Sequence, residues 1–220
     1  MLSTVLRNAA ILDGTGRTAF STDVGIAGDR IALIGDLTGR EALVDIDCTG
    51  KTIAPGFIDV HSHSDELWLV LPRCDGKIAQ GVTTEIGGNC GSSVAPLHGP
   101  ALERLQRSAA RYELDVQWRT LEEFLALVER NGVALNVATL VGLGTTRSAV
   151  AGDDARRLET SEIAEQARLV RQACEAGALG VSSGLIYPPS SYADAHELVA
   201  MADAAREAGA PRYASHVRDE

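Results

Sequence analysis

Two histidines, His61 and His63, follow the apolar segment that begins at Gly56 and are separated by a single residue. Residues two apart on an extended strand face the same side, so both imidazoles are expected to project together from the strand's end. Neutral imidazoles are ligands of borderline-soft cations such as Zn²⁺. Asp59, on the same face, is expected to orient one of these ligands. The alternative is a pair of surface histidines at the start of a loop.

A third candidate ligand, Cys90, lies in the glycine-rich segment Gly87-Gly-Asn-Cys-Gly91, directly after a β-branched run. Glycines there allow positive φ angles and close approach of the backbone. A metal ion lowers the pKa of a neighbouring thiol, so a ligand at this position is expected to be a thiolate. A buried structural cysteine is an equally good interpretation. That alternative describes Cys48, Cys74 and Cys174 better, because none of them ends a predicted strand.

His216 ends another predicted strand, Arg212–His216. Active sites of (β/α) barrels are built at the carboxyl ends of strands. We therefore expect the side chains at three strand ends to converge as metal ligands: His61, His63, Cys90 and His216. A fourth predicted strand delivers Ser183 and, shortly after it, Tyr187, which are candidates for lining a substrate pocket.

The elements that must position these residues change in character after residue 54. Residues 1–54 are short apolar segments separated by turns, including a hairpin signal at Gly28-Asp29, and predict a small β domain. Residues 55–220 alternate strands with helices, which predicts parallel pairing and an α/β fold, a barrel rather than a dinucleotide-binding sheet. The expected strands are Gly56–His61, Val82–Ile86, Val133–Val141, Leu179–Ser183 and Arg212–His216. The expected helices are Leu121–Arg130, opened by a Thr120/Glu123 capping box, Glu162–Ala176, capped by Thr160 or Ser161, and Ala193–Ala208.

Composition sets further bounds on function. The 220 residues are 45% hydrophobic and carry a formal charge of −10, which is typical of a soluble globular protein and argues against nucleic-acid binding. Anionic substrates are not excluded, because the local charge of a pocket can oppose the net charge. There is no export signal and no apolar stretch near the roughly 20 residues that span a bilayer, so we expect a cytoplasmic protein without membrane contact.

At these residues the chain resembles the amidohydrolase superfamily, and within it the N-acyl-D-amino-acid deacylases (D-aminoacylases). The resemblance rests on four segments: Ile53-Ala-Pro-Gly-Phe-Ile-Asp-Val-His-Ser-His63, Gly87-Gly-Asn-Cys-Gly-Ser92, Gly177-Ala-Leu-Gly-Val-Ser-Ser-Gly-Leu-Ile-Tyr-Pro-Pro189 and Tyr213-Ala-Ser-His-Val-Arg-Asp-Glu220. It implies a TIM-type barrel and zinc-dependent hydrolysis of small N-acyl-D-amino acids. It also implies that Cys90 and His216 bind a tight Zn²⁺, that His61 and His63 form a weaker second site, and that Tyr187 faces substrate. Ser183 is a further substrate-binding candidate.

Length indicates that the barrel is incomplete. Without the β domain about 165 residues remain, against about 250 in a typical complete barrel. About five of the eight barrel strands are predicted, and the general-base aspartate implied by the resemblance lies beyond Glu220. We therefore expect an amino-terminal portion that is inactive alone, preceded by part of a composite β-sandwich.

Two other functions remain open from the sequence. A hydantoinase- or dihydroorotase-like amidohydrolase would share the two histidines but would need a bridging lysine on the fourth strand. The chain's two lysines, Lys51 and Lys77, both lie elsewhere, which excludes such a bridge. The second alternative is a non-catalytic half-barrel that binds a metal or a partner. The sequence does not determine the oligomeric state.

Overall fold

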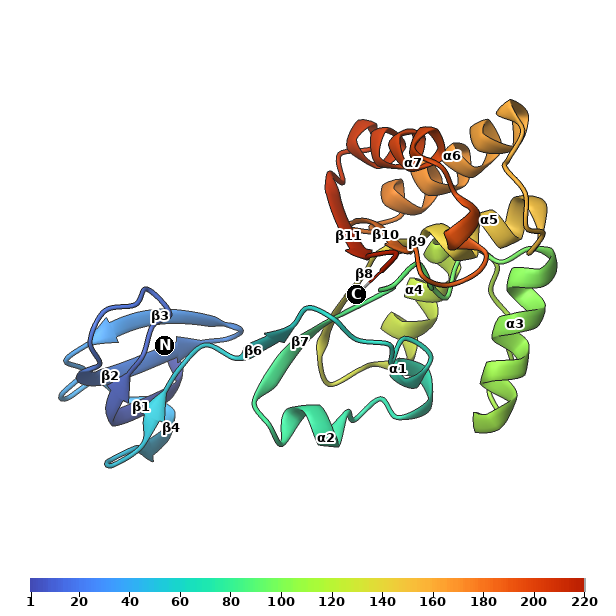
Figure 1. Cartoon of the computed structure of the whole chain (residues 1–220). Helices are drawn as coiled ribbons and strands as arrows, with labels where there is room; N and C mark the ends of the chain where they lie inside the picture. The colour runs from blue at the N-terminus through green and yellow to red at the C-terminus, as the bar shows by residue number, and fades with distance from the viewer. Residues whose placement is uncertain (220) are drawn as a thin grey trace. The chain divides into compact units, whose positions relative to one another are not determined.

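The first part of the chain is a small β-sheet. A computed structural model describes residues 1–219, and the chain divides into two compact units, Met1–Gly56 and Phe57–Glu220. The strand order of the first unit is β3-β2-β1-β4, with β5 also paired to β1 (Figure 1). β1 is antiparallel to β2 and parallel to β4 and β5. The strands are β1 (Leu2–Ile11), β2 (Phe20–Ala27), β3 (Arg30–Gly35), β4 (Ala42–Asp47) and β5 (Thr52–Ile53).

The predicted hairpin of this unit is confirmed, since β2 and β3 pair antiparallel across Gly28-Asp29, with Gly28 at φ +60°. One side of the sheet has a small core made of Ala9, Ile11, Val24 and Cys48. Several large apolar side chains of β3 and β4 are exposed instead: Ile31, Leu33, Ile34, Leu43, Val44 and Ile46. The first unit thus buries only part of its apolar surface within itself.

The second unit alternates strands and helices. Its strands form two parallel three-stranded sheets, β6-β7-β8 and β9-β10-β11. Leu140 separates β8 from β9, so the single strand expected over Val133–Val141 is split in two. Parallel strands joined by helices confirm the predicted α/β character. The strands are β6 (Phe57–Asp59), β7 (Val82–Gly87), β8 (Asn136–Thr139), β9 (Val141–Gly142), β10 (Gly180–Gly184) and β11 (Arg212–His216).

The helices of the second unit match the sequence prediction in part. The capping box on Thr120 is confirmed, because the Thr120 hydroxyl accepts from the Glu123 N–H and the Glu123 carboxylate accepts from the Thr120 N–H. The predicted cap at Thr160 or Ser161 is wrong, since Glu159 caps that helix and Thr160 already lies within it. The helices are α1 (Leu67–Val70), α2 (Asp75–Ile78), α3 (Gly99–Ala109), α4 (Leu121–Asn131), α5 (Leu143–Ala151), α6 (Thr160–Glu175) and α7 (Ala195–Glu207).

An aromatic cluster joins the helices to the loop after β7. The Phe124 ring of α4 lies 5.2 Å from Trp118 and 6.1 Å from Trp68, measured between ring centroids. The Trp118 indole N–H donates to the Val94 carbonyl oxygen at 2.8 Å. α6 and α7 lie side by side in Figure 1 and cover β9 and β10. Among the described residues, no helix combines the length and apolarity that crossing a membrane requires.

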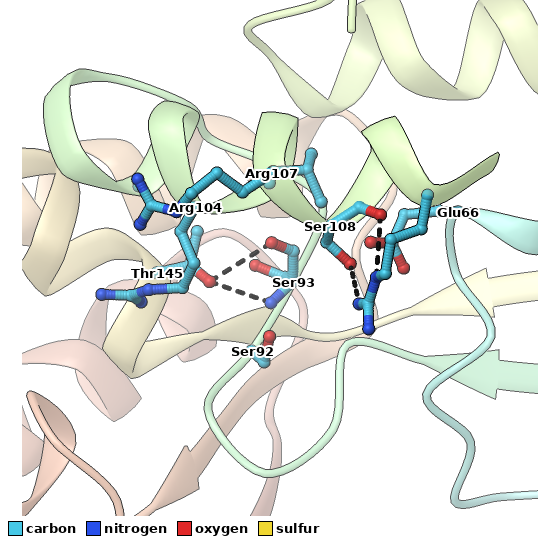
Figure 2. A pocket seen from close by; sticks show the side chains of 10 residues that line it. Glu66, Ser92, Ser93, Arg104, Arg107, Ser108 and Thr145 are labelled. Carbon is cyan, nitrogen blue, oxygen red and sulfur yellow. Dashed lines mark hydrogen bonds between the residues drawn. The ribbon is translucent and has the colours of Figure 1, made fainter. Parts of the chain in front are cut away.

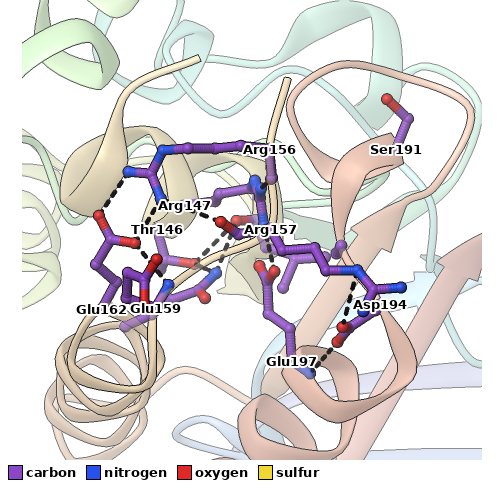
Figure 3. Close-up of polar contacts among 12 residues, drawn as sticks. Thr146, Arg147, Arg156, Arg157, Glu159, Glu162, Ser191, Asp194 and Glu197 are labelled. Carbon is purple, nitrogen blue, oxygen red and sulfur yellow. Dashed lines mark hydrogen bonds and ion pairs between the residues drawn. The ribbon is translucent and has the colours of Figure 1, made fainter. Parts of the chain in front are cut away.

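A buried ion pair connects α5 to α7. Arg147 and Glu197 are each 1% exposed, and the Arg147 guanidinium contacts both the Glu197 carboxylate and the Arg156 carbonyl oxygen (Figure 3). Arg156 in turn forms a two-bond pair with Glu162 at 2.6 and 2.7 Å. A charge this deeply buried is tolerated only when it is paired. The network therefore fixes the loop between α5 and α6 onto the core.

Removing one partner of this pair is expected to destabilise the fold strongly. Glu197→Ala leaves the Arg147 charge buried and unpaired, which costs about 3–5 kcal/mol. The control Glu165→Ala breaks an exposed i,i+3 pair with Arg168 and is expected to cost at most about 0.5 kcal/mol. Urea unfolding gives both free-energy changes. Similar small losses in the two variants would contradict the role assigned to the buried pair.

Candidate metal centre

Cys90 lies in a tight turn that follows β7. Gly88, Cys90 and Gly91 have φ angles of +70°, +52° and +75°, so the turn has a left-handed backbone that glycine adopts at little cost. Asp65 is 6% exposed, and its Oδ1 accepts a hydrogen bond from the Gly88 N–H at 2.7 Å. Burial raises the pKa of this carboxyl to about 7. The backbone of the turn is thus anchored to the segment that follows the two histidines.

The two histidines lie beside the thiol, but not on a strand. β6 ends at Asp59, so the expectation that the strand extends to His61 is wrong. The Asp59 Oδ1 accepts from the His61 N–H at 3.2 Å and turns the chain there. The two imidazoles meet edge to face, with centroids 5.4 Å apart, and the His61 Nε2 lies 3.2 Å from the Cys90 Sγ. The potential ligand atoms of His61, His63 and Cys90 all lie within 4.8 Å of one another.

Asp59 does not orient an imidazole, contrary to the expectation. Its second carboxylate oxygen pairs with the Lys77 ammonium of α2, and this hydrogen bond lowers the pKa of Asp59. Lys77 also lies 3.6 Å from Glu85, the β7 residue that pairs in register with Asp59. The carboxylate is therefore paired with α2, and it interacts with His61 through the backbone N–H and electrostatically.

His216, the last residue of β11, approaches the same thiol. Its Nδ1 lies 3.7 Å from the Cys90 Sγ, and its ring meets the Tyr187 ring edge to face at 5.0 Å. The structure thus brings His216 next to Cys90, although His216 is outside the compact group formed by Cys90, His61 and His63. The Cys90 Sγ thus has one imidazole nitrogen at 3.2 Å, from His61, and another at 3.7 Å, from His216.

The donor atoms fit a zinc ion chemically. Imidazole nitrogen and thiolate sulfur are the ligand types that Zn²⁺ prefers. Burial, and to a smaller extent the nearby His61, lowers the pKa of His63, which favours the neutral imidazole that binds a cation. Burial raises the pKa of the Cys90 thiol, and a bound cation is the usual means of deprotonating such a group.

Sequence reasoning missed Asn89 as part of the site. This side chain is 1% exposed, and its amide donates to the carbonyl oxygens of Ile86 at 2.9 Å and Ser62 at 3.4 Å. Since Ser62 lies between the two histidines, Asn89 connects the histidine segment directly to the Cys90 turn. The only signal in the sequence was an asparagine between Gly88 and Cys90, and its partner Ser62 is 27 residues away along the chain.

The two predicted substrate residues lie in different surroundings. Tyr187 is half exposed and lines a cleft of about 350 Å³ together with His63 and Cys90. Ser183 is fully buried, and its hydroxyl is hydrogen-bonded to Tyr213 at 2.6 Å and Ser215 at 2.9 Å. Ser183 therefore joins β10 to β11, and its contact with a substrate stays a prediction.

A second cleft with basic lining adjoins the first. It measures about 530 Å³ and shares Ser92 and Arg104 with the cleft at Cys90 (Figure 2). Arg107 of α3 and Arg111, shortly after the end of α3, belong to the same lining, together with one acidic residue, Glu66. At its base the Ser93 N–H donates to the Thr145 hydroxyl at 2.9 Å. The clefts beside the candidate ligands thus carry positive charge in a chain whose net charge is −10.

Comparison with known proteins identifies the family. The amidohydrolase family model matches residues 45–216, so the chain belongs to the amidohydrolase family. The N-acyl-D-aspartate deacylase of Alcaligenes xylosoxydans xylosoxydans is 36% identical over 98% of this chain and 43% of its own length. The N-acyl-D-glutamate deacylase of Bordetella bronchiseptica, solved with zinc and a phosphonate inhibitor, superposes with a TM-score of 0.90 at 35% identity, over 100% of this chain and 46% of that one. The resemblance to N-acyl-D-amino-acid deacylases is confirmed.

The matches also define the extent of the similarity. The chain spans less than half the length of these deacylases. The L-hydantoinase of Arthrobacter aurescens superposes with a TM-score of 0.57 at 17% identity, over 96% of this chain and 40% of its own length, which shows a common fold only. At the level of sequence the chain is therefore similar to enzymes of linear N-acyl-D-amino acids.

The geometry of the turn predicts an unequal effect of two glycine substitutions. A Cβ on Gly88 would lie 2.0 Å from the Leu140 carbonyl oxygen, whereas one on Gly132, at φ +75°, would meet no atom within 4 Å. Both alanine variants carry the strain of a positive φ. Gly88→Ala is expected to lose at least about 2 kcal/mol more, because a clash with backbone cannot relax. Denaturant unfolding measures the difference, and equal losses would contradict the close packing of the turn.

Proposed function

We propose that this chain forms the amino-terminal, metal-binding part of a zinc-dependent N-acyl-D-amino-acid deacylase. The enzyme would hydrolyse the amide bond to give a D-amino acid and a carboxylate. The observation that supports this most is the approach of His61, His63 and Cys90, with ligand atoms within 4.8 Å of one another. The 36% identity to an N-acyl-D-aspartate deacylase supports the same class of reaction.

The proposed ligands divide between two positions. Cys90 and His216 would hold a tightly bound Zn²⁺, and His61 and His63 a second, weaker ion. A bound zinc ion supplies Lewis acidity, which polarises an amide carbonyl and lowers the pKa of a coordinated water. The chain's own contribution is to lower the pKa of His63 by partial burial and to hold the Cys90 thiol close to His61.

Charge and shape near the ligands support an anionic substrate. N-acyl-amino acids carry a carboxylate, and a positively charged cleft raises the local concentration of such molecules. Arg104 lines both clefts and is 44% exposed at its side chain, although it pairs with Asp153 at 2.6 Å. Tyr187 is proposed to contact the substrate, because its half-exposed ring lies beside His216 in the cleft at Cys90.

Both units are proposed to be completed by further polypeptide in the whole enzyme. Large apolar side chains at and after β6 are exposed, with Phe57 at 63%, Ile58 at 60% and Val60 at 64%. Such surfaces are normally covered by neighbouring elements. The parallel strands would belong to a (β/α)₈ barrel, and the sheet of residues 1–54 to a composite β-sandwich. The general-base aspartate would also lie in the remainder, so no base is assigned within this chain.

Substitution of the thiol tests the metal centre. Cys90→Ala removes the anionic ligand, so zinc affinity is expected to fall by more than the roughly 10–100-fold typical of changes around a ligand. Cys74→Ala is a matched control, because Cys74 has similar intermediate exposure and a positive φ of +46° but lies outside the cluster. Zinc content after dialysis, measured by mass spectrometry, separates the two. Unchanged zinc in Cys90→Ala would remove Cys90 from the site.

A chimera tests the reaction. Residues 1–220 replace the matched 46% of the Bordetella bronchiseptica N-acyl-D-glutamate deacylase. The chimera is expected to hydrolyse N-acetyl-D-glutamate, N-acetyl-D-aspartate or N-acetyl-D-leucine in a zinc-dependent way, and to spare the L-enantiomers. The 220-residue chain alone is expected to be inactive.

Three results would contradict the proposed reaction. A folded, zinc-loaded chimera that cleaves none of the D-substrates would favour a non-catalytic metal-binding role. Cleavage of hydantoins alone would favour a cyclic-amide hydrolase. Activity that persists in the Cys90→Ala chimera after removal of metal would overturn the metal-dependent mechanism.

A further inference from the structure

A buried serine of β10 lies directly behind the Cys90 turn. Ser182 is fully buried, and its hydroxyl accepts from the Gly91 N–H at 3.0 Å and donates to the Gly88 carbonyl oxygen. These two backbone groups lie on either side of Cys90. One hydroxyl therefore closes both ends of the segment that carries the thiol, from a strand that is 91 residues further along the chain.

The other hydrogen bonds of the turn involve different backbone groups, so the Gly91 N–H and the Gly88 carbonyl oxygen are bound by Ser182. The Gly88 N–H is bound by Asp65, the Asn89 carbonyl oxygen accepts from Ser92 at 3.0 Å, and the Gly91 carbonyl oxygen accepts from Thr145 at 3.1 Å. A buried backbone group without a partner destabilises the arrangement that leaves it unpaired. Loss of the Ser182 hydroxyl would leave one donor and one acceptor unsatisfied in a space that excludes water.

The contact surfaces around Ser182 leave no room for a different arrangement of the turn. A Cβ on Gly91 would lie 2.7 Å from the Gly184 nitrogen, and a Cβ on Gly184 would lie 2.1 Å from the Cys90 carbonyl oxygen. The backbone of the turn thus rests on the backbone of β10. Any relaxation that satisfies the two groups in another way must move Cys90 relative to β10 and to the neighbouring β11.

We propose that Ser182 is a positioning residue for the Cys90 thiolate in the metal centre. Its hydroxyl fixes the peptide segment from Gly88 to Gly91, and thereby the distances from the Cys90 sulfur to the His61 and His216 nitrogens. Ser182 touches neither the metal nor a substrate. The inference rests on the proposed metal centre, and the experiment below separates the two.

The test uses Co²⁺ as a spectroscopic substitute for zinc in the 220-residue chain. Coordination of a thiolate to Co²⁺ gives a near-ultraviolet charge-transfer band, which reports the Cys90–metal bond independently of activity. Ser182→Ala is expected to weaken this band and to lower metal affinity about 10–100-fold, as loss of a hydrogen bond behind a ligand commonly does. Ser148→Ala is the control, because it deletes another fully buried hydroxyl, on α5, outside the turn.

Two variants of equal volume, Ser182→Thr and Ser182→Val, keep the proposal testable if the alanine variant does not fold. Ser182→Thr keeps the hydroxyl and Ser182→Val replaces it by a methyl group at equal volume, so the threonine variant is expected to keep the band and the valine variant to lose it. Circular dichroism confirms that the compared variants are folded.

Each outcome decides between the proposals. A normal band in folded Ser182→Ala, or equal bands in the threonine and valine variants, would overturn the role of Ser182 alone. A band weakened equally by Ser148→Ala would also overturn it, since the effect would then be general to buried hydroxyls. Absence of any band in the unsubstituted chain would instead overturn the proposed metal centre, and the role of Ser182 with it.

Discussion

Close contact between backbones at the Cys90 turn is the constraint on which the candidate site depends. A Cβ at Gly88 would lie 2.0 Å from the Leu140 carbonyl oxygen, and one at Gly142 would lie 2.4 Å from the Gly91 carbonyl oxygen. Backbone atoms of neighbouring segments thus lie against the turn, which restricts where its main chain can lie. A reactive group is thus held on a part of the fold that has little freedom to move.

The clefts near the Cys90 turn are lined by basic side chains, whereas the chain as a whole is acidic. The sequence carries a net charge of −10, yet three arginines in and just after α3 line the clefts next to the candidate ligands. The Asp65 carboxyl is buried, and one of its oxygens accepts a hydrogen bond from the Gly88 N–H. Local potential near a cleft depends on the exposed groups around it rather than on the total charge. An acidic protein can therefore offer a basic entrance at the position where a carboxylate would arrive.

The sequence predicted what is encoded locally. The hairpin at Gly28-Asp29 and the capping box at Thr120 are short-range signals, and the structure confirms both. The expected strand end at His61 is wrong, because a remote partner, Lys77, engages Asp59 and the strand ends there. α5 was not predicted, because its buried face includes polar residues such as Arg147, which hide the helical pattern of apolar side chains. The roles of His61, His63, Cys90 and His216 as ligands stay predictions.

Hydrogen bonds within the chain hold the segments that carry the candidate ligands in place. The segment between the two histidines is joined to the Cys90 turn through Asn89, and the turn is joined to β10 through Ser182. These bonds hold the two segments whose His61 Nε2 and Cys90 Sγ lie 3.2 Å apart. When the ligand groups of a site are already ordered, little free energy is lost in ordering them on binding, and the affinity is higher. In the proposed metal centre, selectivity for a borderline cation would follow from the nitrogen and sulfur donors, and affinity would depend on the hydrogen bonds that hold the donor segments.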